Sequence, residues 1–332
     1  FQAALAAGPG SPERARYHFR DGQGRGGAQP PNRWRSVFGG PGWTRVVEPD
    51  GTPGQWYLHL FDVTQPDLNW EHPQVRAEFL DILRYWLDRG VDGFRVDVAH
   101  ALVKAPGLPD YDDAPAAPLT AAGDERPPTH LAPMWDQDGV HEIYRSWRAL
   151  LDSYGEPARI LCAEAWVHPV ERAMLYVRPD EMHQSFAFDF LDTPWRAADL
   201  REVIAHDRNT MASVGAAPTW VLSNHDVVRT ASRLGLPAGS PRPNGLGPRS
   251  SVRPDPGLGL RRARAAATLM LALPGAAYLY QGEELGLPDH PELPDEVRQD
   301  PVWVRTEHRE LGRDGCRVPL PWVGDAPSLG FG

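Results

Sequence analysis

The sequence predicts an α/β protein built around a parallel barrel. Short apolar runs alternate with amphipathic segments five times between residues 72 and 286, which is the order of successive βα units. Three of the apolar runs are followed by an acidic residue, namely Asp97, Glu164 and Asp226. A carboxylate at the end of a buried strand is costly to place. Parallel barrels put such residues at the mouth of the barrel, where their chemistry takes place.

The clearest helix is expected over residues 72–90. Val75, Phe79 and Leu83 recur there at four-residue steps, so apolar side chains share one helix face. Gly90 suits the position directly after a helix end. Further helices are expected over residues 141–155, 195–215 and 258–275.

Strands are expected wherever a short apolar run ends in polar residues or turn formers. These runs cover residues 90–100, 158–166, 184–190, 219–226 and 276–286. Residues 105–138 are rich in Pro and Asp and predict a long loop, which in a compact barrel is usually functional.

The first 62 residues have a different character. They are rich in Gly, Pro, Trp and Arg and lack a sustained hydrophobic period, which predicts mostly loops and turns. Residues 54–61, GQWYLHLF, have strand character.

The composition excludes several classes of protein. The 332 residues are 41% hydrophobic, enough to bury a large core. A net charge of −10 without a basic stripe argues against nucleic acid and anionic membranes as partners. The sequence contains no run of 18 apolar residues, so no membrane span is expected. No Cys/His pair at zinc spacing and no EF-hand loop occur, so no metal or other cofactor is expected.

Cysteine and lysine usage are both unusual. Cys162 and Cys316 are the only cysteines, which favours a reducing, cytoplasmic setting over a disulfide framework. Lys104 is the only lysine among 34 basic residues. A single lysine in a composition this rich in Arg, Ala, Pro and Gly suggests that Lys104 has a specific role. The alternative is that this lysine is present by chance.

Six segments together resemble the α-amylase superfamily, glycoside hydrolase family thirteen. Three of them carry the strand-end acids: GFRVD (93–97), AEAW (163–166) and NHD (224–226). The other three are QPDLNW (65–70), YQGEELG (280–286) and GRDGCRVPLPW (312–322), and they resemble the oligo-1,6-glucosidase and α-glucosidase branch. All six occur in the family's order.

The resemblance implies a (β/α)8 TIM barrel of which strands four to eight are present. Residues 1–62 would be most of the inserted domain B, and residues 63–332 the C-terminal part of the catalytic barrel. We interpret the chain as a fragment truncated at both ends, and we expect the isolated fragment to be inactive.

The resemblance also assigns the two bond-making and bond-breaking groups. Asp97 would be the nucleophile, and Arg95 would lie beside it because side chains two apart share a strand face. Glu164 would be the general acid and then the general base. That task needs a raised pKa, obtained by burial and neighbouring negative charge.

Further site residues follow from the same comparison. Asp226 would stabilise the transition state and bind sugar hydroxyls, with His225 and Arg229 donating hydrogen bonds in the same subsite. Lys104 and His100 lie beyond the nucleophile and would reach the acceptor side of the site.

The function implied is a retaining, exo-acting α-glucosidase acting on small oligosaccharides. Val98, directly after the nucleophile, is the residue type found in relatives that accept α-1,6 linkages. Two alternatives stay open. One is a transglucosylase or isomerase of the trehalose synthase or isomaltulose synthase type. The other is a non-catalytic, transporter-associated relative, which should have lost carboxylates and carry a membrane span.

Overall fold

The computed structural model describes residues 1–111, 127–240 and 243–330. These residues form two compact units. The first unit comprises residues 1–186 and 209–216, and the second comprises residues 187–208 and 217–332.

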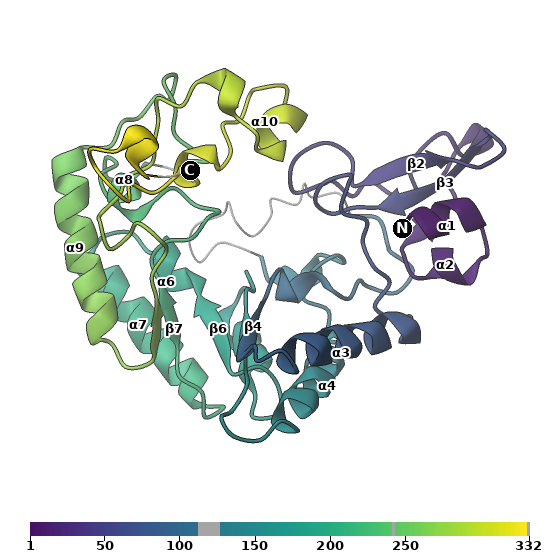
Figure 1. Ribbon diagram of the computed structural model, residues 1–332, viewed down its shortest axis with the longest axis horizontal. Coiled ribbons are helices and arrows are strands. Elements are labelled where there is room, and N and C mark those ends of the chain that lie inside the picture. Colours follow the sequence, from purple (N-terminus) through teal and green to yellow (C-terminus); the bar gives the residue numbers. More distant parts are fainter. Residues whose placement is uncertain (112–126, 241–242, 331–332) are drawn as a thin grey trace. The chain divides into compact units, whose positions relative to one another are not determined.

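The first unit contains the strands that carry Asp97 and Glu164. Strands β4 (Gly93–Val96), β5 (Ile160–Ala163) and β6 (Gln184–Ala187) follow one another as parallel neighbours. Helix α3 (Pro73–Leu87) precedes β4, and α4 (Val140–Asp152) lies between β4 and β5 in the chain (Figure 1). His72 caps α3 by accepting a hydrogen bond from the Gln74 N–H.

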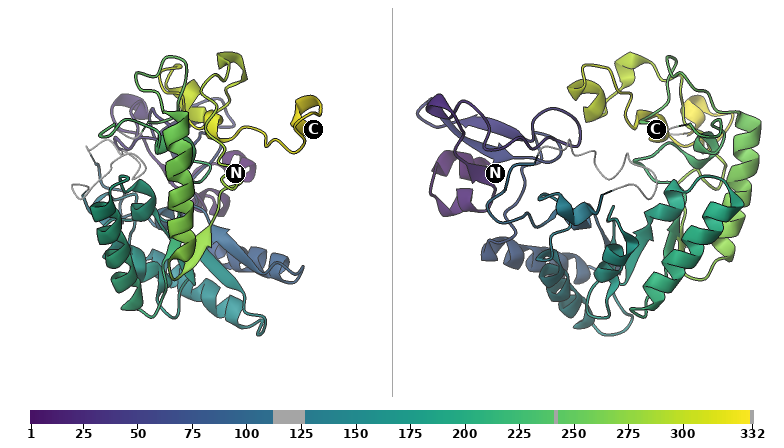
Figure 2. Two further views of the ribbon diagram at one scale, coloured as in Figure 1. Left: turned by 90° about the vertical axis from the view of Figure 1, so that its left-hand side faces the viewer. Right: turned by 180° about the vertical axis from the view of Figure 1, so that it is seen from behind.

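The second unit contains the strand that precedes Asp226. Strands β7 (Thr219–Val221) and β8 (Ala276–Tyr278) pair in parallel, and the long helix α9 (Pro256–Ala272) lies between them in the chain (Figure 2). Helix α7 spans Ala197–Ala212. The shorter helices of this unit include α6 (Phe188–Asp192), α8 (Thr230–Arg233) and α10 (Pro301–Arg305), whereas α5 (Val170–Ala173) belongs to the first unit.

The five expected parallel strands are all present, and each is shorter than its apolar run. One expectation was wrong in its second half: residues 188–190 were expected to extend a strand, but they begin α6. Phe188, Phe190 and Leu191 are all buried. A short, fully apolar run is compatible with a buried strand or a buried helix, so hydrophobicity alone did not separate the two.

Residues 1–62 contain more regular structure than expected. Helices α1 (Gln2–Ala7) and α2 (Pro12–Ala15) accompany an antiparallel sheet of β1 (Phe19–Arg20), β3 (Pro53–Leu58) and β2 (Trp43–Val47). Helices of four to six residues are too short to show a hydrophobic period, which is why the sequence predicted loops. Of the expected long loop over 105–138, residues 112–126 lie outside the described part of the chain.

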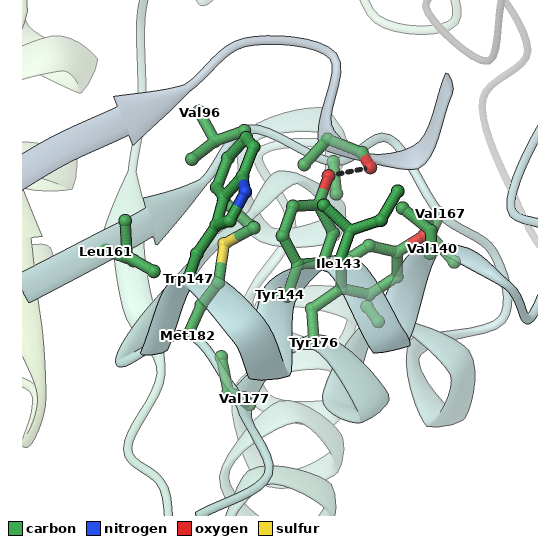
Figure 3. Packing of buried hydrophobic residues seen from close by; sticks show 14 of the residues in the cluster. Val96, Val140, Ile143, Tyr144, Trp147, Leu161, Val167, Tyr176, Val177 and Met182 are labelled. Atoms are coloured by element: carbon green, nitrogen blue, oxygen red, sulfur yellow. Dashed lines mark hydrogen bonds between the residues drawn. The ribbon is translucent and has the colours of Figure 1, made fainter. Parts of the chain in front are cut away.

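The largest core of the first unit lies between its parallel strands and helices. Val96 and Leu161 from the strands pack with Ile143, Tyr144 and Trp147 of α4 (Figure 3). The Tyr144 hydroxyl also donates a hydrogen bond to the carbonyl of Ala99. Because Ala99 follows Asp97 by two residues, this core anchors the backbone just beyond the strand end.

Candidate active site

The register of β4 and β5 aligns two of the candidate carboxylates. Val96 pairs with Ala163, so Asp97 and Glu164 are the next residues on neighbouring parallel strands. The ladder continues past the strand ends: the Glu164 N–H donates to the Val96 carbonyl at 2.9 Å, and the Ala99 N–H donates to the Glu164 carbonyl at 2.8 Å. Neighbouring strands lie about 4.8 Å apart. Asp97 and Glu164 therefore lie side by side at the carboxyl ends of β4 and β5.

Arg95 lies between the two carboxylates. Its guanidinium donates a hydrogen bond to Asp97, and its Nη2 lies 3.9 Å from Glu164 Oε2. A guanidinium in this place reduces the repulsion between two adjacent carboxylates.

The two carboxylates differ in their surroundings. The Asp97 side chain is 68% exposed, whereas that of Glu164 is 7% exposed. Glu164 is followed in the chain by two further buried residues, Ala165 and Trp166. The chain thus provides one accessible carboxylate and one desolvated carboxyl on adjacent strands.

Val98 has an unusual backbone conformation at this edge. Its φ is 45°, in the left-handed region that a β-branched residue rarely adopts. In this conformation its backbone N–H donates to Glu164 Oε2 at 2.8 Å. Strain of this kind is found at functional sites, where the surrounding structure holds it in place.

His100 and Lys104 lie in the interior of the first unit. His100 is 3% exposed, and its ring packs against Trp135 with centroids 5.3 Å apart. Burial, and then the charge of Lys104, lower the pKa of His100 to about 3, so its ring is neutral at physiological pH. Lys104 is 5% exposed, and its Nζ lies 2.7 Å from Asp67 Oδ1. In this structure the only lysine joins the segment after Asp97 to the QPDLNW segment.

Asp226 is held by two arginines of the second unit. Arg313 Nη1 and Arg317 Nη2 each lie 2.8 Å from Asp226 Oδ1. The other carboxylate oxygen, Oδ2, lies 3.3 Å from Nε2 of His225. The turn itself is fixed by Asn224, whose side-chain oxygen accepts the Asp226 N–H at 2.8 Å.

Arg229 is a buried arginine with partners near the end of β8. It is 2% exposed, and its Nη1 donates to the Gln281 carbonyl at 2.8 Å. Its guanidinium lies 4.6 Å from the ring centroid of Tyr280, and its backbone N–H donates to Asp289 Oδ1 at 2.7 Å. These contacts join the segment after Asp226 to the YQGEELG segment.

The sequence interpretation missed Arg313, Arg317 and the N–H of Val98. Both arginines occur in GRDGCRVPLPW, a segment that was used only to recognise the family branch. Their separation of four residues was the available signal, but nothing local connects them with an acid about ninety positions earlier. A backbone donor such as Val98 leaves no trace in residue types.

Neither a metal cluster nor a membrane span is found in the described parts of the chain. Among residues 1–111, 127–240 and 243–330, no group of three or more His, Cys, Asp or Glu side chains could hold a metal ion. Over the same ranges, no helix is both long and apolar enough to cross a membrane.

Comparison with known proteins places the chain in a family. Residues 1–332 match the family described as Alpha amylase, catalytic domain. The oligo-1,6-glucosidase of Parageobacillus thermoglucosidasius is 30% identical over 97% of this chain and 56% of its own length. A probable alpha-glucosidase of Rhizobium meliloti is 34% identical over 91% of this chain and 51% of its own length.

Solved structures agree with this placement. The alpha-glucosyl transfer enzyme XgtA superposes with a TM-score of 0.78 at 32% identity and covers 100% of this chain and 57% of its own. The isomaltulose synthase of Erwinia rhapontici NX5 has a TM-score of 0.74 at 25% identity, over 99% of this chain and 57% of its own.

The parallel strands and the helices between them in the chain define part of a parallel α/β barrel. The chain belongs to the alpha-amylase catalytic-domain family, and its fold is the corresponding part of a (β/α)8 barrel, as expected. Its matches include oligo-1,6-glucosidases and alpha-glucosidases, and it spans about half the length of these curated relatives.

Proposed function

We propose that the intact protein is a retaining, exo-acting α-glucosidase that hydrolyses terminal α-1,4 or α-1,6 glucosidic bonds of small oligosaccharides. The observation that carries the proposal is the alignment of Asp97 and Glu164 on adjacent parallel strands. Retaining glycosidases need two carboxyl groups about 5 Å apart, which is close to the spacing of neighbouring strands, about 4.8 Å.

In the first step, an oxygen of the ionised Asp97 carboxylate attacks the anomeric carbon. The bond between that carbon and the glycosidic oxygen breaks as Glu164 transfers its proton to the departing oxygen. The product is a glucosyl ester of Asp97. The exposure of Asp97 and its hydrogen bond from Arg95 support the role of an accessible nucleophile held in place by a guanidinium.

In the second step, Glu164 acts as a base. It takes a proton from water, the resulting hydroxide attacks the anomeric carbon, and the ester bond to Asp97 breaks. Asp226 would stabilise the positively charged transition state and bind sugar hydroxyls, assisted by His225. The protein would require no cofactor, and its partner would be the oligosaccharide itself.

The remaining candidate residues support this site from its surroundings. We propose that Lys104 and His100 shape the acceptor side from within, since both are buried, and that Arg229 braces the turn that carries Asp226. We retain residues 1–62 as the domain B-like insertion, because they form their own antiparallel sheet. We also retain the cytoplasmic setting, because two buried cysteines, Cys162 and Cys316, do not make a disulfide framework.

A second candidate function is glucosyl transfer. It is favoured by neighbours titled alpha-glucosyl transfer enzyme and isomaltulose synthase. The first step is the same, and a sugar hydroxyl replaces water in the second. Products formed from maltose, isomaltose, sucrose and trehalose separate the two functions: hydrolysis releases free glucose, whereas transfer yields a rearranged disaccharide.

Three measurements on the intact protein test the proposal. Asp97→Asn should abolish turnover without changing the thermal unfolding midpoint, because a neutral amide cannot attack. Glu164→Gln should impair glucosides with poor leaving groups most and activated aryl glucosides least, since the latter need little protonation. NMR of the first-formed sugar should show the α-anomer. Release of β-glucose first would contradict a double displacement.

A further inference from the structure

Arg313 connects Asp226 to a second, buried acid. Its Nη1 lies 2.8 Å from Asp226 Oδ1, while its Nε lies 2.7 Å from Asp300 Oδ2. The Asp300 side chain is 1% exposed and that of Arg313 is 18% exposed. One guanidinium thus bridges a carboxylate of the candidate site and a carboxylate in the interior of the second unit.

The surroundings of Asp300 fix the position of Arg313. Asp300 Oδ2 accepts the backbone N–H of Arg313 at 2.7 Å as well as its Nε. Its Oδ1 accepts the Val302 N–H at 2.9 Å and so caps α10. Burial acts to raise the pKa of Asp300, but the hydrogen bonds and charge of Arg313 outweigh it, and the pKa lies below its usual value.

The backbone next to Arg313 is fitted closely to Asp300. Gly312 has a φ of 66°, and a Cβ at this position would lie 2.7 Å from Asp300 Cγ. Only glycine combines this conformation with this approach. The loop that carries Arg313 therefore rests directly on the Asp300 carboxyl group.

We infer that Asp300 is a positioning residue that acts on Asp226 through Arg313. The inference rests on the proposed function, in which Asp226 stabilises the transition state. Without the Asp300 carboxylate, Arg313 loses the charged partner of its Nε and the acceptor of its backbone N–H. Arg317 still contacts Asp226 at 2.8 Å, so Asp226 is loosened rather than released, and the loss of activity is partial.

The test is a double-mutant cycle in the intact protein, with kinetics on an aryl α-glucoside. Asp300→Asn keeps the shape of the side chain and its ability to cap α10. It should lower kcat by about 10- to 100-fold with little change in KM, because a displacement of about 1 Å at a reacting group has an effect of that order. Arg313→Gln should have a similar effect. The double variant should be no worse than Arg313→Gln alone, because Asp300 acts through Arg313.

Multiplicative losses in the double variant would overturn the inference, as would wild-type kcat in Asp300→Asn. If Asp300→Asn does not fold, Arg313→Lys replaces it, because lysine keeps the charge but cannot bridge two carboxylates with a planar fork. That variant should show the same fall in kcat, and unchanged kcat would count against the inference. Asp295→Asn is the matched control, since Asp295 pairs with Arg298 and Arg249 instead, and its kinetics should equal those of the wild type.

Asp226→Asn separates this inference from the proposed function. If Asp226→Asn leaves turnover intact, the proposed role of Asp226 fails and Asp300 has nothing to position. If Asp226→Asn removes turnover while Asp300→Asn retains wild-type kcat, only the positioning role fails.

Discussion

Val98 combines a strained backbone with a place beside both carboxylates. Its left-handed φ of 45° directs its N–H to Glu164, and it follows Asp97 directly. Valine at this position is the residue type found in relatives that accept α-1,6 substrates, and in this chain the backbone of the same residue contacts Glu164, the proposed acid. Its side chain and its backbone have separate roles.

Val98→Thr tests the side chain without altering the backbone. Threonine has the same branched shape but places a hydroxyl where a methyl group was. We expect the ratio of kcat/KM for isomaltose to kcat/KM for maltose to fall by roughly tenfold, or about 1.4 kcal/mol. Hydrolysis of an aryl α-glucoside is the control and should stay within about twofold of the wild type. An unchanged isomaltose-to-maltose ratio would show that linkage preference is set elsewhere.

A site residue could be predicted from the sequence where it stands at the end of a recognisable strand. Asp97 and Glu164 were identified because each ends an apolar run, and the register of β4 and β5 then aligns them. Arg313 was not identified, because its contact with Asp226 joins positions 87 residues apart. Such a contact is created by the tertiary fold, and no local pattern encodes it.

The pairing of β4 with β5 is the element on which the candidate site depends. Gly93 begins β4, and a Cβ there would lie 2.4 Å from the Ile160 carbonyl oxygen. The two strands can approach closely only because this residue has no side chain. A change at the start of the pair should therefore disturb Asp97 and Glu164 at its end.

Gly93→Ala should destabilise the protein by roughly 2 kcal/mol, the typical effect of overpacking, and lower activity as well. Gly257→Ala is the matched control. Gly257 lies in the first turn of α9, and the nearest atoms to a Cβ there are 3.5 Å away. Alanine is favoured over glycine in a helix, so the control should unfold at the same or a higher temperature. Equal stability of the two variants would refute this account of the β4–β5 pair.

Helix α7 carries a buried acid that should make stability depend on pH. Asp207 is 1% exposed, and burial, followed by the nearby charge of Asp189, raises its pKa to about 8. The unfolded chain releases this proton near pH 4. Between these values the folded state binds more protons than the unfolded state, so the free energy of unfolding falls as the pH rises from about 4 to about 8.

Asp207→Asn should remove this pH dependence, because the carboxamide stays neutral throughout the range. At pH 8 the variant should be more stable than the wild type by up to about 5 kcal/mol, since each of the roughly four units of pKa shift corresponds to about 1.4 kcal/mol. Thermal unfolding at pH 5 and pH 8 measures the difference. Glu202→Gln changes an exposed acid of the same helix and should leave the pH dependence intact. A wild-type slope in Asp207→Asn would contradict the argument.

Helices could be predicted from the sequence where they were long enough to show a hydrophobic period. Helices α3, α4, α7 and α9 have 13 to 17 residues, and all four were expected. Helix α2 has four residues and depends on Ser11, whose side chain accepts the Arg14 N–H, and on Pro12 in the first turn. Its formation is decided by capping and tertiary contacts, which hydrophobic periodicity does not register.

At the scale of the molecule, apolar side chains are exposed in each unit. In the second unit, Leu271, Leu279 and Leu285 are 61%, 48% and 56% exposed, and they line a hollow of about 480 Å³ beside β8. In the first unit, Tyr85 and Trp86 of α3 are 50% and 48% exposed. Monomeric soluble proteins rarely leave such patches uncovered.

The 332 residues expressed alone should therefore self-associate and lack turnover. We expect strong binding of an anionic naphthalene dye, concentration-dependent light scattering and no hydrolysis of an aryl α-glucoside. A barrel site needs groups from several strands, and misplacement by about 1 Å has a large effect on rate. A soluble monomer with one cooperative unfolding transition and clear turnover would show that these residues complete the site by themselves.

The most direct test of the proposed function is to identify the residue that becomes glucosylated. The intact protein would be treated with a fluorinated glucosyl substrate that forms the covalent intermediate faster than it is hydrolysed, then digested and analysed by mass spectrometry. A double displacement through Asp97 should give one added fluoroglucosyl group, linked as an ester to the Asp97 carboxylate, and no labelling of Asp97→Asn. Labelling of any other residue, or turnover of the reagent without a covalent adduct, would contradict the double displacement through Asp97 and Glu164.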